Sequence, residues 1–140
     1  MTSPIRAVAV SQGGYAADVA MRQHSVRIDE PPSDGGGDSG PMPTELLCAA
    51  LAGCFLVALR FVGDKRDLEL PGLEVVATAE RAGRELRYGR FIVDARCARP
   101  RAEWEDLIER AARVCWVSNT ISGGAEVVYR VTEFNARFPE

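Results

Sequence analysis

The longest run of apolar residues in the chain covers residues 46–59, and it contains no charged side chain. Alanine and leucine dominate it, and both are good helix formers. Pro43 and Thr44 provide a start signal, with a hydroxyl able to cap the first amides, and Gly63 and Asp64 provide the stop. The pattern predicts one core helix, apolar on every face, because the run is shorter than the roughly 20 residues that a bilayer requires.

Alternating apolar and polar residues predict strands on both sides of this helix. Three strands precede it as a meander, a hairpin follows it, and one strand closes the chain, over residues 5–10, 15–21, 24–28, 73–81, 86–98 and 125–134. Between the meander and the helix lies a tract rich in Pro, Gly, Ser and Asp, residues 30–43, which predicts a loop. Composition leaves open whether this loop is ordered or mobile.

A second helix is predicted between the hairpin and the last strand, over residues 101–121. Its apolar positions have the spacing of an amphipathic helix, at Trp104, Leu107, Ile108, Ala111 and Val114. Cys115 lies at the far end of this pattern. The resulting order of elements predicts an α+β domain with helices packed on antiparallel sheets, rather than a parallel doubly wound sheet.

A chain of 140 residues is expected to form one domain over residues 1–140, small enough that dimerisation would help to cover its core. The 17 basic and 20 acidic residues give a net charge of −3, and no run of like charge suggests a nucleic acid or a membrane surface as partner. The amino terminus lacks the pattern of a secretory signal, so the expected location is the cytoplasm.

The chemistry-bearing residues are four cysteines and one histidine, Cys48, Cys54, Cys97, Cys115 and His24. Their spacing fits neither a zinc site nor a disulfide scaffold. In a reducing compartment such thiols serve packing or redox chemistry. Cys54 follows a step of two small residues that would let a ligand or another backbone approach its sulfur, although a buried cysteine often acts only as a small hydrophobe.

Three stretches of sequence carry a resemblance to a known family. They are DEPPSDGGGDSGPMPTELL at residues 29–47, ALAGC at residues 50–54 and CWVSNTIS at residues 115–122. In this order they resemble the OsmC/Ohr superfamily, and specifically its OsmC-like branch. The resemblance covers the chain from Tyr15 onward. It implies antiparallel sheets wrapped around a long buried central helix, in an intertwined homodimer with active sites at the subunit interface.

The resemblance also implies a thiol peroxidase that acts on organic hydroperoxides or hydrogen peroxide. Cys54 would attack the peroxide and become a sulfenic acid, and Cys115 would condense with it to a disulfide. An external dithiol, such as a lipoyl group on a carrier protein, would reduce that disulfide. No metal or organic cofactor is required.

Peroxide attack needs a thiolate, so positive charge is expected near the reactive cysteine. In the family an arginine of a Gly-Gly-Arg motif supplies it, steered by a glutamate just ahead of the central helix. Here the Gly-Gly pair at 13–14 is followed by Tyr15. Glu45 matches the glutamate of the OsmC-like branch, and Arg22 or Arg27 would have to replace the arginine. Cys54, Cys115, Glu45 and Arg22 are therefore the predicted site.

Other residues receive structural assignments. Cys48 is expected in the core, Cys97 at a strand end as a structural thiol, and His24 as neither a base nor a metal ligand. Phe55 and Trp116, next to the two predicted site cysteines, could line an apolar pocket or simply pack.

Two alternatives to a peroxidase stay open. One is a non-enzymatic protein that binds a small apolar or electrophilic molecule in the same dimer-interface pocket, which the absence of the Gly-Gly-Arg arginine favours. The other is a pair of inert core thiols.

Overall fold

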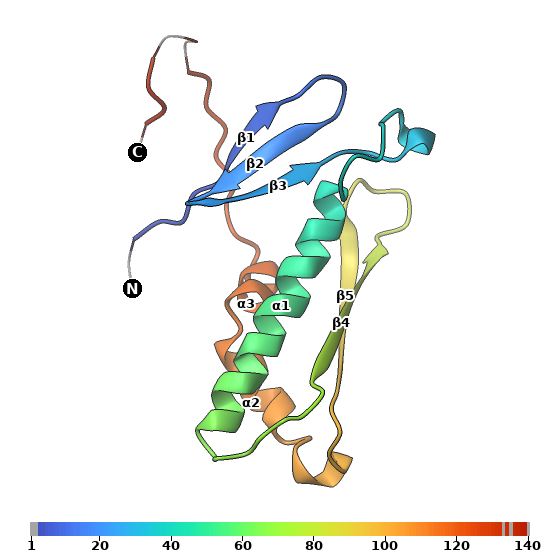
Figure 1. The fold of residues 1–140 in the computed structure, drawn as a ribbon, viewed down its shortest axis with the longest axis vertical. Helices are drawn as coiled ribbons and strands as arrows, with labels where there is room; N and C mark the ends of the chain where they lie inside the picture. Colours follow the sequence, from blue (N-terminus) through green and yellow to red (C-terminus); the bar gives the residue numbers. More distant parts are fainter. Residues whose placement is uncertain (1–2, 133, 135, 140) are drawn as a thin grey trace.

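The computed structural model describes residues 3–132, 134 and 136–139 of the chain. Its helices and strands follow the predicted α+β order, with helix α1 at the centre (Figure 1). The strands are β1 (Val8–Ser11), β2 (Ala17–Met21), β3 (His24–Ile28), β4 (Glu74–Arg81) and β5 (Tyr88–Arg96). The helices are α1 (Pro43–Asp64), α2 (Leu107–Val114) and α3 (Trp116–Gly123), with short 3-10 turns η1 (Pro32–Asp34) and η2 (Arg101–Glu103).

Helix α1 has 22 residues and confirms the predicted central helix. The prediction that the Thr44 hydroxyl caps it is wrong, because Thr44 already lies within the first turn and Met42 occupies the capping position. The Glu45 carboxylate instead reaches back and accepts a hydrogen bond from the Met42 N–H at 3.1 Å. A negative charge at this end of a helix also suits the helix dipole.

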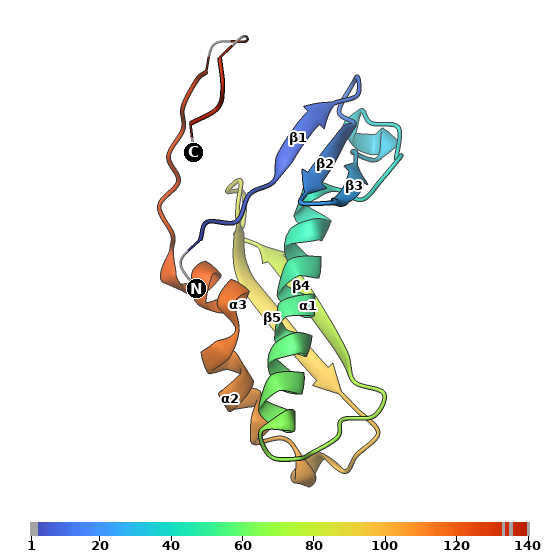
Figure 2. The same cartoon turned by 60° about the vertical axis from the view of Figure 1, so that its left-hand side comes forward.

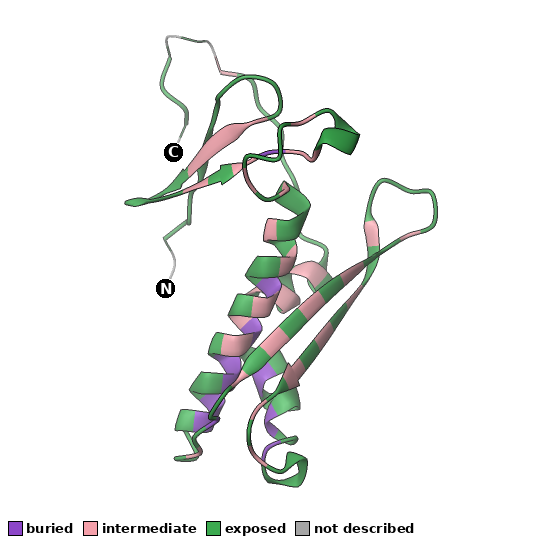
Figure 3. Cartoon of the chain, turned by 45° about the vertical axis from the view of Figure 1, so that its right-hand side comes forward, coloured by how far each residue is buried: buried purple, intermediate pink, exposed green. Residues whose placement is uncertain are grey.

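Only one face of α1 is buried, which corrects the prediction of a helix buried all round (Figure 3). Leu51 and Leu59 are fully buried, whereas Val57 is 64% exposed and Phe61 51% exposed. The helix also has the length and composition of one able to cross a membrane, so length alone does not decide its role. Its buried face packs against β4, α2 and α3, as a core helix does.

The β4–β5 hairpin contributes the inward-facing residues of this core. Its strands pair in antiparallel register, with Ala77 opposite Val93, and half-buried positions alternate with exposed ones along both strands. Val75 and Val93 pack against the buried residues of α1 and α2. Figure 2 shows α2 and α3 running alongside α1, with the hairpin extending along the same helix.

The amino-terminal sheet has the order β1-β2-β3 and confirms the predicted meander. It lies at the amino end of α1, apart from the main core (Figure 1). Much of its apolar surface faces solvent, since Val8 is 39% and Val10 55% exposed. The sheet therefore has an uncovered face in the single chain.

The loop between β3 and α1 is ordered by a buried carboxylate. Asp29 is 3% exposed and accepts hydrogen bonds from the Ser39 hydroxyl at 2.7 Å and from the backbone N–H groups of Glu30, Gly37 and Ser39. The Ser39 hydroxyl is the main reason that the pKa of Asp29 falls to about 2, and the three amides add to the effect against burial, which raises it. The tract is thus a folded loop rather than a free connector.

The lowered pKa of Asp29 predicts that the fold becomes less stable as the pH falls into the acid range. A carboxyl with a folded pKa below its unfolded pKa of about 3.9 stabilises the fold fully above pH 4 and loses this effect as the pH falls toward 2. The variant Asp29→Asn should be less stable than the wild type at pH 7, with a melting temperature several degrees lower. In thermal melts, the difference in melting temperature between the wild type and Asp29→Asn should narrow from pH 4 to pH 2. A difference that stays constant over this range would contradict this account.

The structure differs from the prediction at two places near the carboxyl end. The helix predicted over residues 101–121 is interrupted at Cys115, whose φ of −83° and ψ of 104° are extended. The strand predicted over residues 125–134 is not formed in the described residues 125–132 and 134. This segment is exposed, with Val131 101% and Tyr129 89% accessible, and it pairs with no strand among the described residues.

Candidate active site

The two cysteines predicted to act together meet in the core. Cys54 lies on the inner side of α1, half-buried, and packs against the buried cluster that contains Cys115. The Cys54 thiol is one of the neighbouring groups that lower the pKa of Cys115. Both cysteines are free thiols in this structure. The fold therefore joins residues from two helical segments that are far apart in the sequence.

Cys115 owes its position to the break between α2 and α3. Its backbone carbonyl accepts hydrogen bonds from the Asn119 N–H at 3.1 Å and the Ser118 hydroxyl at 3.2 Å. The Asn119 side chain donates to the Arg113 carbonyl at 3.1 Å and so ties α3 to the end of α2. The break places Cys115 at the capping position of α3, where unpaired amides face it.

The surroundings of Cys115 favour its thiolate although the residue is fully buried. Burial raises the pKa of Cys115, but the Ser118 side chain and amide, the Cys54 thiol and the Val117 amide together lower it below the usual value. None of these donors forms a full capping hydrogen bond to the sulfur in this structure. Cys115 is thus a buried thiol with donors gathered around it.

Sequence reasoning missed Ser118. It belongs to the CWVSNTIS stretch, but nothing marked its side chain as a partner of Cys115. The signal was its spacing, since a residue three positions after a helix cap is the one whose amide and side chain face the cap. Recognising the helix break at Cys115 would have been required to use that signal.

The structure places the other predicted site residues away from the thiol pair. Glu45 lies nine residues before Cys54 on α1. Since an α-helix rises 1.5 Å and turns 100° per residue, Glu45 lies about 13 Å from Cys54 along the helix axis and on the opposite face. Its carboxylate is engaged with the Met42 N–H. Arg22 lies in the turn between β2 and β3 with a left-handed φ of 56°. Among the described residues, no hydrogen bond or ion pair joins either side chain to Cys54 or Cys115.

The remaining candidates also have definite positions. Arg27 pairs with Asp18 at 2.5 Å across β2 and β3, and this partner raises the pKa of the guanidinium further. Cys48 is half-buried rather than in the core, which corrects that prediction. Tyr15, in the place of the family's arginine, is 64% exposed. Trp116, next to Cys115, is 74% exposed and does not pack in the core.

A cavity of about 450 Å³ adjoins Ser118, although neither Cys54 nor Cys115 lines it. It lies between α1, β5 and α3, and its apolar lining includes Leu51, Tyr88, Phe91 and Ile121. Ser118, the partner of Cys115, also lines it. Leu51 precedes Cys54 by one helical turn, so the cavity follows the face of α1 that carries the thiol. Among the described residues, no group of histidine, cysteine and acidic side chains could hold a metal ion.

The fold and the site define an α+β protein built on a central helix, with a pair of free cysteines in its core. The family model of the OsmC-like proteins matches residues 35–130. The chain is 31% identical, over 96 residues, to the organic hydroperoxide resistance protein of Xanthomonas axonopodis pv. citri (strain 306), a match that covers 66% of this chain and 68% of the relative. This chain belongs to the OsmC-like family, within the OsmC/Ohr superfamily.

Solved structures agree on the fold. An OsmC-like protein of Mycoplasma pneumoniae superposes with a TM-score of 0.72 at 18% identity, covering 89% of this chain and 91% of that chain. An organic hydroperoxide resistance protein OsmC of Legionella pneumophila gives a TM-score of 0.66 at 22% identity, covering 87% and 93%. These likenesses confirm the predicted OsmC-like architecture. The name of the Xanthomonas relative supports hydroperoxide resistance as a role in the family.

Proposed function

We propose that this protein is a cysteine-based peroxidase that reduces organic hydroperoxides or hydrogen peroxide. The observation that carries the proposal is the meeting of Cys54 and Cys115 in the core, with donors around Cys115 that favour its thiolate. The name of the Xanthomonas relative supports a hydroperoxide as the substrate. Cys54 acts as the peroxidatic thiol and Cys115 as the resolving thiol.

The reaction balances with the two thiols and one external dithiol. The Cys54 thiolate attacks a peroxide oxygen, the O–O bond breaks, and the alkoxide takes a proton and leaves as an alcohol. The Cys115 thiolate then attacks the sulfenic sulfur, an S–S bond forms, and the displaced hydroxide leaves as water. An external dithiol, such as a lipoyl group on a carrier protein, reduces the disulfide by exchange and is itself oxidised to a disulfide.

The lowered pKa of Cys115 suits the second and third steps. A resolving thiol attacks as its thiolate, and in the reduction step the thiol with the lower pKa is the better leaving group. Ser118 and the amides at the start of α3 therefore support resolution and reduction more than the first attack. The cavity beside Ser118, which has apolar walls as well as Arg87 and Arg90 in its lining, has room for the alkyl part of a hydroperoxide.

We further propose that the protein works as an intertwined homodimer in the cytoplasm. The exposed apolar face of α1, the uncovered amino-terminal sheet and the extended segment 125–132 all lack cover in the single chain. A second copy would supply it. Arg22 and Glu45, which lie away from the thiols of their own chain, would then serve the site of the partner or its entrance. No metal or organic cofactor takes part.

The test is disulfide formation in the reduced wild-type protein after one equivalent of cumene hydroperoxide. Two thiols per chain should disappear within seconds, and peptide mass mapping should find a bridge between Cys54 and Cys115. The variants Cys48→Ser and Cys97→Ser should form the same bridge at the same rate. A protein whose thiols persist for many minutes would be a binding protein or a structural pair, and the peroxidase would be excluded.

A further inference from the structure

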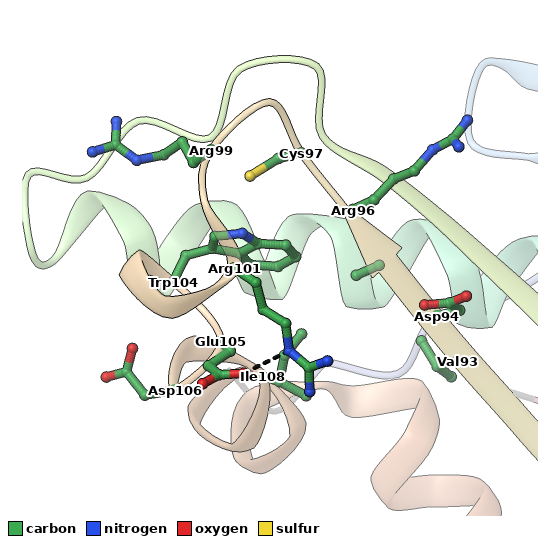
Figure 4. Close-up of a pocket in the computed structure, with 11 residues that line it drawn as sticks. Val93, Asp94, Arg96, Cys97, Arg99, Arg101, Trp104, Glu105, Asp106 and Ile108 are labelled. Carbon is green, nitrogen blue, oxygen red and sulfur yellow. Dashed lines mark hydrogen bonds and ion pairs between the residues drawn. The ribbon is translucent and has the colours of Figure 1, made fainter.

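A second hollow lies away from the thiol pair, at the end of β5. It has a volume of about 680 Å³, within the range of pockets that take small organic ligands. The turn η2 and the start of α2 form its other walls (Figure 4). Neither Cys54 nor Cys115 lines it, and its apolar floor includes Val93, Trp104 and Ile108. We call this hollow the Cys97 groove, after the one thiol that lines it.

The floor of the Cys97 groove contains a buried donor without an acceptor. Trp104 is 6% exposed, and its indole Nε1–H has no hydrogen-bond partner in the described part of the chain. A buried donor left unpaired is costly, and native proteins leave few of them. Figure 4 shows the nitrogen edge of the indole turned toward the Cys97 side chain. An acceptor attached at Cys97 would therefore satisfy it.

Cys97 itself is a half-buried free thiol just after β5. Its inner side packs against the main core, and its outer side lines the groove. This position differs from that of Cys115, which is fully enclosed. A molecule in the groove can thus reach the Cys97 sulfur without the core being opened.

The rim of the groove offers guanidinium groups to an anion. Arg99 and Arg101 pair with Glu103 at 3.1 Å and Glu105 at 2.6 Å, in both cases through Nε. Among the described residues, the terminal nitrogens of the two guanidinium groups donate no hydrogen bond to a carboxylate. An arginine held through one edge keeps further N–H donors for a second carboxylate. The groove thus combines a thiol, an unpaired buried donor and an apolar floor with a rim on which arginines (Arg96, Arg99 and Arg101) lie among acidic side chains (Asp94, Glu105 and Asp106).

We propose that the Cys97 groove holds a small carboxylate-bearing thiol as a mixed disulfide on Cys97. The Cys97 thiolate attacks one sulfur of the corresponding small disulfide, an S–S bond to Cys97 forms, and the old S–S bond breaks. The second half of the small disulfide leaves as a thiolate and takes up a proton. Cys97 is oxidised and that leaving half is reduced, so no further oxidant is needed. The proposal is independent of the peroxidase cycle.

The bound thiol would satisfy the features of the groove together. Its sulfur and any oxygen acceptor close to that sulfur would lie next to Cys97, where the Trp104 N–H lacks an acceptor. Its carboxylates reach the rim, where Arg99 and Arg101 have donors to spare. The apolar floor carries the remainder of the molecule.

The experiment uses the full chain with Cys54→Ser and Cys115→Ser, so that only Cys48 and Cys97 remain, and oxidised glutathione as the probe. Mass mapping should show one adduct, on Cys97, that forms at least about tenfold faster than the adduct on Cys48. Adding Trp104→Phe, which keeps an aromatic side chain, though a smaller one, and removes the N–H, should slow adduct formation or speed its loss by about threefold to tenfold. Equal rates at Cys48 and Cys97, or no effect of Trp104→Phe, would overturn the proposal.

A second readout uses the wild-type cysteines and does not depend on the double variant folding. In Trp116→Phe, Trp104 is the one remaining tryptophan of the two in the chain. Its fluorescence should be quenched when oxidised glutathione is added and recover with dithiothreitol, and Cys97→Ser should abolish the quenching. Quenching that survives Cys97→Ser, or none in the wild-type cysteine background, would show that the probe does not bind beside Trp104.

Discussion

The variant Cys54→Ser is expected to lose hydroperoxide reduction almost completely, with kcat/KM lower by roughly a thousandfold or more. Serine has nearly the shape of cysteine, but its hydroxyl is not ionised near neutral pH and cannot form a sulfenic acid. Because the side chain is half-buried and of similar size, the fold should be unchanged. Consumption of cumene hydroperoxide, followed with a dithiol reductant in excess, measures the loss.

The variant Cys115→Ser provides the contrast that assigns the two roles. It should still react with one equivalent of hydroperoxide and stop at a Cys54 sulfenic acid, which dimedone would trap. Multiple turnover through the disulfide should be lost. The lowered pKa of Cys115 makes the reverse assignment a real competitor. If Cys115→Ser abolished the first oxidation while Cys54→Ser retained it, Cys115 would be the peroxidatic thiol and the proposed order would be wrong.

The central helix and both antiparallel sheets were predictable because their signals are local. Uncharged residues rich in alanine predict α1, and alternation predicts the hairpins, since period and turn residues are properties of neighbouring positions. The limits of α1 followed from Pro43 and Gly63. The face it buries did not, because the sequence is apolar all round and burial depends on which elements happen to lie beside it.

The errors arose where structure depends on distant partners. The apolar pattern runs from Leu107 through Ala111 to Cys115 with helical spacing, so it gave no sign of the break at Cys115. The predicted strand over residues 125–134 has strand-like residues, but a strand needs a paired neighbour, and no strand among the described residues pairs with it. The same residues would suit pairing with a second copy, which a single sequence does not reveal.

The thiol pair shows the same division between local and distant information. The family resemblance, carried by the order of the three motifs, implied that Cys54 and Cys115 act together. Their spacing in the sequence said nothing about the distance between them. Ser118 and the α3 amides act on Cys115 only because the chain turns there. The Cys97 groove was equally hidden, since Cys97 and Trp104 come together through the turn η2, whose geometry no periodicity encodes.

The second large effect is expected at Gly40, in the loop that leads into α1. A Cβ added there would lie 2.2 Å from the Arg27 carbonyl oxygen and 2.7 Å from its carbon. Both are backbone atoms of β3, so no side-chain rotation can relieve the contact. Gly36 has the same constraint, with the Glu30 carbonyl oxygen 1.9 Å from the position of a Cβ. Gly36 and Gly40 are thus required for the loop to lie against the end of β3 and the residues that follow it.

Gly40→Ala should therefore destabilise the fold by about 3 kcal/mol or more, since overpacking against immobile atoms forces the backbone to shift. For a chain of this size that corresponds to a fall in melting temperature of roughly 10 °C. Gly123→Ala is the matched control, because nothing lies within 4 Å of a Cβ at that position, and its melting temperature should change little. Differential scanning calorimetry of both variants decides the matter. A Gly40→Ala protein as stable as the control would mean that the loop does not pack on β3 as described. The conclusion that the segment leading into α1 is ordered would then be wrong as well.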